Sequence, residues 1–102
     1  MLNVTNKKPS ECTNITDVRN EIDNIDKVIV TLLSERFQYV KEVVKYKENT
    51  PDSIVASDRR NVVLHQRRQW AEEQGLDPNV IEEIYTRLIQ YFISEEMKIK
   101  NL

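Results

Sequence analysis

The stretch of residues 14–48 restricts the fold more than any other feature of this sequence, because it contains neither glycine nor proline. Its aliphatic residues recur at the three- and four-residue spacing that marks one face of a helix. These residues are Ile15, Val18, Ile22, Ile25, Ile29, Leu32, Val40, Val43 and Val44. The pattern predicts one helix over about residues 14–48, capped by Thr13 and roughly 50 Å long at ~1.5 Å per residue.

A helix of this length determines the architecture. A compact domain of about 100 residues has a radius of gyration of only ~13 Å, so the rest of the chain is too short to cover such a helix. A second chain must therefore cover it. We predict a homodimer in which two long helices pack together.

The remainder of the chain predicts two further helices. Glycine occurs once and proline three times, so the turns are few. A second helix is expected from Ser57, as its N-cap, to Gly75, which is a natural C-terminal stop. Asp77 and Pro78 supply a cap and a first-turn proline for a third helix that ends near Ile99. The predicted fold is all-α, with three helices in one domain over residues 13–102.

Several classes of protein are disfavoured by composition. The chain has 15 basic and 17 acidic residues, a net charge of −2, and its basic residues are scattered, which argues against nucleic-acid and anionic-membrane binding. No apolar run approaches the ~20 residues of a membrane span, and the polar residues 1–12, a predicted flexible leader, lack a secretory signal. We expect a cytoplasmic protein. One cysteine, Cys12, and one histidine, His65, leave no Cys/His metal set.

Two cations lie on an apolar stripe of the first predicted helix. Steps of 4, 7 and 11 residues from Arg36 reach Val40, Val43 and Lys47, all within ~40° of its direction. Burying an unpartnered cation is costly, so the stripe predicts an anionic ligand. Arg19 lies ~25 Å from Arg36 along the same helix. Only the Arg19 of an antiparallel partner chain could therefore share that ligand.

Two more residues could complete such a site. Arg59, in the first turn of the second predicted helix, adds a fourth cation beyond the loop at 48–55. Glu96 continues an apolar stripe of the third helix and offers a carboxyl group to the cations. One alternative stays open, because long basic side chains also reach solvent from apolar stripes and form ion pairs without chemistry. A non-catalytic helical dimerisation module accounts for the same pattern.

Short motifs then point to one family. In order along the chain they are P-S-E-C-T (9–13), V-R-N-E-I-D-N-I-D (18–26), R-F-Q-Y-V-K (36–41), Y-K (46–47), A-S-D-R (56–59), R-Q-W-A-E-E-Q-G-L-D (68–77) and Y-F-I-S-E-E (91–96). Each motif is weak by itself. In this order, from Pro9 to Lys98, they resemble the isochorismate-pyruvate lyases of siderophore salicylate synthesis, which have the all-helical chorismate mutase fold.

The resemblance implies an intertwined homodimer with two identical pockets, each receiving Arg19 from the partner. The implied reaction is a concerted pericyclic elimination of pyruvate from isochorismate, which gives salicylate and needs no metal, cofactor or covalent intermediate. Arg19 and Arg36 would bind the two carboxylates, and Lys47 would stabilise the ether oxygen as the C–O bond breaks. The implied catalytic residues are Lys47, Arg36 and Glu96, and the substrate-binding residues are Arg19, Arg36, Val40, Lys47, Arg59 and Ile93.

Three positions bear on the choice of reaction. Typical bacterial chorismate mutases of this fold have acidic residues where this chain has Ala56 and Arg60, which favours the lyase with weak activity on chorismate. A chorismate mutase making prephenate is the next alternative. The lyases usually have glutamine where this chain has Glu96, and an ionised glutamate only accepts hydrogen bonds. Our hypothesis is that Glu96 acts in its protonated form, so that activity rises toward acid pH.

Overall fold

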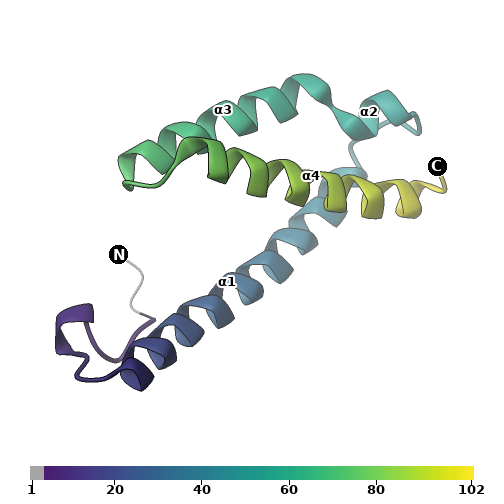
Figure 1. Cartoon of the computed structure of the whole chain (residues 1–102). Helices are drawn as coiled ribbons and strands as arrows, with labels where there is room; N and C mark the ends of the chain where they lie inside the picture. The colour runs from purple at the N-terminus through teal and green to yellow at the C-terminus, as the bar shows by residue number, and fades with distance from the viewer. Residues whose placement is uncertain (1–3) are drawn as a thin grey trace. The chain divides into compact units, whose positions relative to one another are not determined.

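A computed structural model describes residues 4–102, which form helices and no β-strand in that range (Figure 1). A short 3-10 helix, η1 (Pro9–Glu11), precedes α1 (Ile15–Val44), α2 (Pro51–Val55), α3 (Ser57–Glu73) and α4 (Pro78–Lys100). The all-α class and the three long helices are confirmed. The five-residue helix α2 lies within the predicted loop and was not expected.

The first helix ends earlier than the sequence predicts. The amides of Lys45, Tyr46 and Lys47 donate to the carbonyls three residues before them, at 3.2, 3.0 and 3.1 Å. This spacing is that of a tight 3-10 turn, which stops the α-helix at Val44. The expected end near residue 48 is therefore wrong, and Lys47 does not lie on the helical stripe that contains Arg36.

Two of the predicted helix starts are also one residue away from the observed ones. Asn14, and not Thr13, caps α1, because its side-chain Oδ1 accepts the amide of Asp17 at 2.9 Å. Ser57 is the first residue of α3, whose cap is Ala56 in the left-handed conformation (φ 46°) without a side-chain hydrogen bond. A helix start is set by backbone conformation, which several neighbouring polar residues can accommodate.

The other predicted boundaries are confirmed. Asp77 caps α4 by accepting the amide of Asn79 at 2.9 Å, and Pro78 follows it as the first helical residue. Gly75 has φ 73° just after α3, a conformation that favours glycine. The start of α2, like that of α4, combines a side-chain cap with a proline: Thr50 accepts the amide of Ser53 at 3.2 Å, and Pro51 is the first helical residue.

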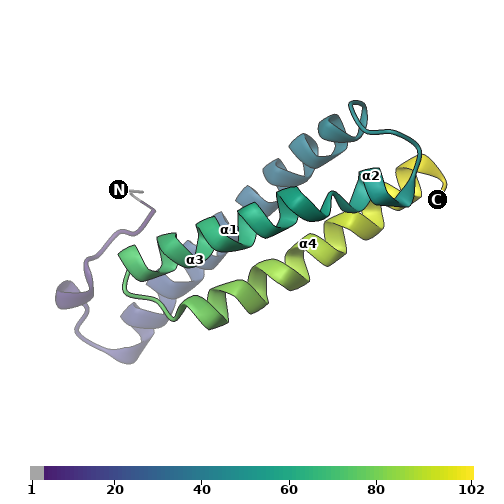
Figure 2. The ribbon, with the colours of Figure 1, turned by 90° about the horizontal axis from the view of Figure 1, so that it is seen from above.

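The chain forms two compact units, divided between residues 38 and 39. In the second unit, α3 and α4 run antiparallel and side by side, and α2 lies against α4 (Figures 1 and 2). Arg68 on α3 joins the two helices by hydrogen bonds to Asn79 at 2.9 Å and Glu82 at 3.2 Å. The core of this unit contains Val44, Ile54, Val63, Ala71 and Phe92.

The first unit holds most of α1 and the segment before it. The amides of Asn6 and Lys7 donate to Glu21 Oε2 at 2.7 and 3.1 Å, and the Lys7 ammonium lies 3.0 Å from Asp17 Oδ2. The hydrogen bond to Asp17 raises the pKa of Lys7, and the amide of Thr13, followed by Lys7, lowers the pKa of Asp17. The flexibility of residues 1–12 and the single domain over 13–102 stay predictions.

None of the helices within residues 4–102 combines the length and the apolar character that crossing a bilayer requires. The cytoplasmic location expected from the sequence stays a prediction.

Candidate functional site

Lys47 and Glu96 form an enclosed ion pair in the second unit. The ammonium Nζ of Lys47 donates to Glu96 Oε1 at 2.8 Å and to the main-chain carbonyl of Ile54 at 2.9 Å. The side chains of Lys47 and Glu96 are 19% and 5% exposed. The lysine therefore holds its charge away from bulk water, between α2 and α4.

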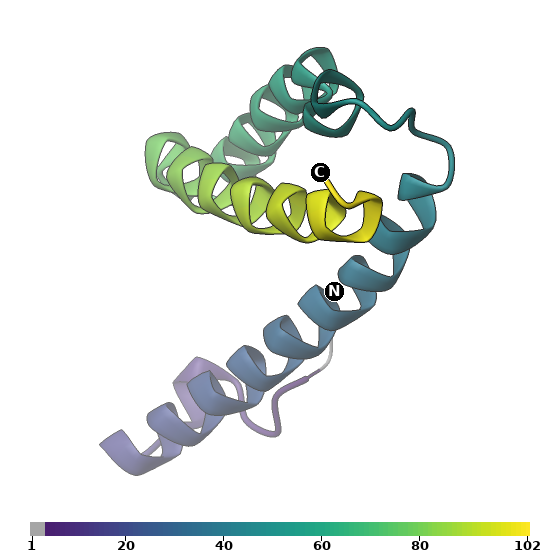
Figure 3. The same cartoon turned by 90° about the vertical axis from the view of Figure 1, so that its right-hand side faces the viewer.

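The elements around Lys47 explain why it lies there. Val44, the buried last residue of α1, precedes the turn, and Ile54 anchors α2 with a side chain that is 0% exposed. Figure 3 shows the chain leaving α1 through the turn and loop before it enters α2. Within that loop the amide of Glu48 donates to Ser53 Oγ at 2.9 Å. The loop thus returns the chain so that the Ile54 carbonyl faces the Lys47 ammonium.

The charge of this pair has two chemical consequences. A lysine ammonium has three protons, and among the contacts of residues 4–102 the bonds to Glu96 and Ile54 use two of them, which leaves one for a ligand. The pair itself is neutral, so the positive charge that attracts an anion must come from other residues. Removing either partner would leave a buried charge uncompensated, which is strongly destabilising.

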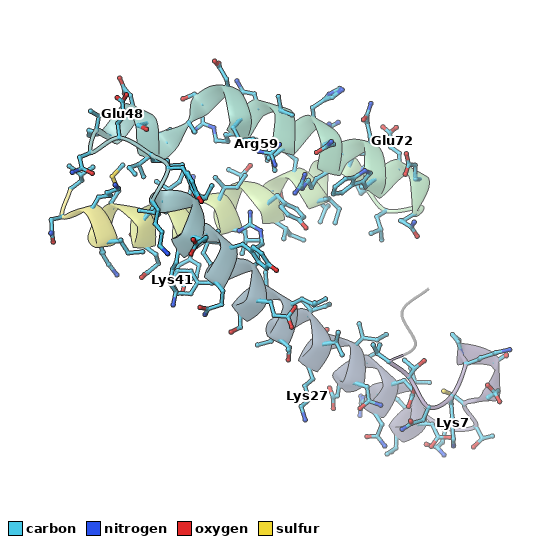
Figure 4. All side chains as sticks on the ribbon, turned by 180° about the vertical axis from the view of Figure 1, so that it is seen from behind. Lys7, Lys27, Lys41, Glu48, Arg59 and Glu72 are labelled. Carbon is cyan, nitrogen blue, oxygen red and sulfur yellow. The ribbon has the colours of Figure 1, made fainter. Side chains whose placement is uncertain are left out.

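Three further predicted residues belong to the same unit. Val40 on α1 and Ile93 on α4 are half-buried, whereas Arg59 is exposed in the first turn of α3. Figure 4 labels Arg59 there and Glu48 in the loop that follows Lys47. An exposed guanidinium at this position is accessible to a ligand or to another chain.

The other two predicted arginines lie on α1 in the first unit. Arg19 is exposed and Arg36 is half-buried. Since both lie on one continuous helix, about 25 Å separates them along its axis, and they cannot bind the same small molecule within one chain. The apolar face of this helix is exposed in the chain, with Ile22 at 50% and Ile25 at 41%.

Two contacts of the site were not predicted from the sequence. The Ile54 carbonyl is a main-chain atom, so no residue type marks it. Lys100 donates from Nζ to the main-chain carbonyl of Lys47 at 3.1 Å. A signal for Lys100 does exist, because it follows Glu96 by four residues and therefore shares its helix face.

Known proteins resemble this chain over most of its length. The family model of chorismate mutase type II matches residues 18–97. The isochorismate pyruvate lyase of Pseudomonas aeruginosa is 38% identical over 92 residues, which are 90% of each chain. The T-protein of Enterobacter agglomerans is 32% identical over 80% of this chain and 22% of its own length. The chorismate mutase of Methanocaldococcus jannaschii is 27% identical over 76% of this chain and 78% of its own.

Proposed function

The chain belongs to the chorismate mutase type II family, and we propose that it acts as an isochorismate pyruvate lyase. The observation that carries the proposal is the enclosed Lys47 ammonium, with one proton left for a ligand, in a chain that matches a lyase over 90% of both lengths. The products would be salicylate and pyruvate.

The proposed reaction rearranges bonds in a single cycle of electrons. The bond between the ring carbon and the ether oxygen breaks, and a ring hydrogen moves to the methylene carbon of the enolpyruvyl group. The ether oxygen becomes the ketone oxygen of pyruvate, and the ring becomes aromatic. Charge develops on the ether oxygen in the transition state, so the remaining proton of Lys47 is suited to stabilise it.

The two carboxylates of the substrate require cations other than Lys47, because Glu96 neutralises the charge of that lysine. We assign this role to Arg19, Arg36 and Arg59. A guanidinium binds a carboxylate through two parallel hydrogen bonds and so fixes both its position and its orientation. Holding the enolpyruvyl group over the ring in this way is catalysis by positioning.

A homodimer is part of the proposal, with Arg19 donated across its interface. The exposed apolar face of α1 supports this arrangement, because such a face is expected to be covered by another chain. The ~25 Å between Arg19 and Arg36 supports it as well, since the two arginines can meet only when they come from different chains.

The second candidate is a chorismate mutase that makes prephenate, because a relative named chorismate mutase matches the chain. The family resemblance favours the lyase over the mutase at two positions. Typical mutases of this fold have acidic residues there, and this chain has Ala56 and Arg60. A non-catalytic dimerisation module is the third candidate and belongs to a different class.

One assay separates the three candidates. The purified chain is incubated with isochorismate and, separately, with chorismate, without added metal or cofactor. Salicylate fluorescence and an equal amount of pyruvate from isochorismate are the expected result, with slow prephenate formation from chorismate. Faster turnover of chorismate than of isochorismate would identify a mutase, and no turnover of either would leave the dimerisation module.

A further inference from the structure

Lys100, the last residue of α4, contacts the residue that we assign to catalysis. Its ammonium donates to the main-chain carbonyl of Lys47 at 3.1 Å, although 53 residues separate the two in sequence. Basic side chains at a helix C-terminus commonly interact with the last carbonyls of their own helix. Lys100 is instead half-buried and reaches the turn that follows α1.

Two residues of α4 therefore hold Lys47 at two different places. Glu96 accepts from the ammonium of Lys47, and Lys100 donates to its main-chain carbonyl. Glu96 and Lys100 are one helical turn apart and project from the same face of α4. The helix thus fixes both the charged end of the lysine and the backbone from which that end extends.

The backbone contact matters because the turn is otherwise exposed. Lys45 and Tyr46 are exposed, and so are residues 48–50. The amides of residues 45–47 make 3-10 hydrogen bonds, whose geometry is poorer than that of α-helical ones. A hydrogen bond from an ionised donor is stronger than one between neutral groups, so the Lys100 contact ties this turn firmly to α4.

We propose that Lys100 is a positioning residue for the lyase reaction, which it supports by fixing the main chain of Lys47. The inference rests on the proposed function. A displacement of about 1 Å in a catalytic group can cost on the order of 100-fold in rate. Because Lys47 acts on charge that develops in the transition state, the loss of Lys100 should lower kcat more than it raises KM.

The first test replaces the donor. Lys100→Met keeps most of the apolar length of the side chain and removes its hydrogen bond. We expect kcat to fall roughly 5- to 20-fold with KM changed less than about twofold, which is within the effect of a misplaced catalytic group. Lys100→Arg, which retains a charged donor, should restore most of the rate. Lys98→Met is the matched control, because Lys98 is exposed and pairs with Glu95.

A double-mutant cycle then separates positioning from a general effect on stability. If Lys100 acts through Lys47, the Lys100→Met change should have no further effect on kcat in a Lys47→Ala background. An equal loss of kcat in both backgrounds would overturn the proposal.

A spectroscopic measurement tests the contact without relying on activity. Lysine is followed by glutamate only at 41–42 and 47–48, so labelling with carbonyl-13C lysine and 15N glutamate gives two carbonyl-to-amide signals. We expect Lys100→Met to move the Lys47 signal and to leave the Lys41 signal, from within α1, in place. If the wild-type chain forms no salicylate, the proposed function fails while this measurement still decides the contact. An unmoved Lys47 signal would overturn the positioning role.

Discussion

The ammonium of Lys47 lies 2.8 Å from the carboxylate of Glu96, and 49 residues separate the two in sequence. Both side chains are largely enclosed, at 19% and 5% exposure. An anionic substrate that takes a hydrogen bond from Lys47 must therefore share the ammonium with a resident carboxylate. This relationship makes the charge of Glu96 as important for the site as that of Lys47.

Replacing Lys47 tests its catalytic role. Lys47→Ala should lower kcat by about 100- to 1000-fold, the effect typical of losing one donor to a developing negative charge. Lys45→Ala should keep full activity, because Lys45 is 68% exposed and pairs only with the nearby Glu42 among the described residues. The measurement is steady-state salicylate formation from isochorismate. Similar rates for both variants would contradict the assignment of Lys47.

A stability effect must be separated from this loss, because Lys47→Ala leaves Glu96 buried without its partner. The Lys47→Ala/Glu96→Gln double variant removes that uncompensated charge. We expect it to recover stability in urea unfolding but not activity. Recovery of kcat together with stability would show that the single variant was inactive because it was poorly folded.

Replacing Glu96 tests the effect of its charge on the substrate. Glu96→Gln keeps an oxygen that accepts from Lys47 and removes one negative charge. KM for the dianionic substrate should fall about three- to tenfold, because the variant no longer repels the substrate's negative charge. At an effective dielectric constant of about 20 that repulsion is still substantial. The hypothesis that the protonated form of Glu96 is the active one adds a second expectation. Protonation neutralises the carboxylate as glutamine does, so wild-type activity should rise toward acid pH and the variant should lack that rise.

The measurement for Glu96 is kcat and KM between pH 5 and 9. Glu95→Gln is the matched control, because the neighbouring Glu95 pairs with the exposed Lys98. Identical pH profiles for the wild type and Glu96→Gln would rule out the protonated form as the active one.

Ile54 should be the residue on which the conformation of the loop depends, because its side chain is 0% exposed and its carbonyl accepts from Lys47. Ile54→Val should destabilise the fold by about 0.5–1.5 kcal/mol and Ile54→Ala by about 2–5 kcal/mol, the ranges observed for buried aliphatic truncations. The free energy of unfolding of both variants is measured in urea, and the smaller truncation serves as the control for the larger one. Equal losses for Ile54→Ala and Ile54→Val would contradict the prediction, because they would mean that the surrounding residues close around the smaller side chain.

The sequence predicted the local features of the fold more accurately than the tertiary ones. Asp77, Pro78 and Gly75 mark their boundaries through their own capping and backbone preferences, so those boundaries could be read directly. The end of α1 could not be predicted in this way, because residues 45–48 contain neither glycine nor proline. The helix stops where Lys47 makes contacts with distant residues, which periodicity does not reveal.

The candidate site divides in the same way. Residue type and helical spacing were enough to predict Glu96 as a carboxyl counterpart, and it does pair with Lys47; its relation to Arg19, Arg36 and Arg59 stays a prediction. The spacing argument for Lys47 itself was wrong, since Lys47 lies beyond the helix, and the Lys47–Glu96 contact depends on the turn and on α2. The Ile54 carbonyl could not be predicted, because main-chain acceptors depend on the path of the loop.

The contact between Lys7 and Asp17 predicts a pH dependence in the first unit. The pKa of Asp17 is lowered, so its stabilising contribution is present above its ordinary value of about 3.9 and is lost as the pH falls through the lowered pKa. The pKa of Lys7 is raised, so its contribution is present below about 10.4 and is lost as the pH rises through the raised pKa. The contribution of the Lys7–Asp17 contact to stability should therefore be constant between about pH 3.9 and about pH 10.4.

The amide of Thr13 reports this contact directly, because it donates to Asp17 Oδ2 at 3.2 Å. Its 1H–15N signal should stay in place from pH 5 to 7 and move below about pH 4 as Asp17 protonates. Asp17→Asn should abolish that movement. A Thr13 signal that titrates identically in the variant would show that another group is responsible.

Mixing two inactive variants tests whether Arg19 is donated across the dimer. If Arg19 of one chain and Lys47 of its partner share a pocket, a heterodimer of Arg19→Ala and Lys47→Ala contains one intact site and one doubly damaged site. Random exchange makes half of the dimers heterodimers, so an equal mixture should recover about a quarter of the wild-type activity. If both residues came from the same chain, every site would be damaged. Salicylate formation before and after subunit exchange thus decides the question, and no recovery would contradict the shared pocket.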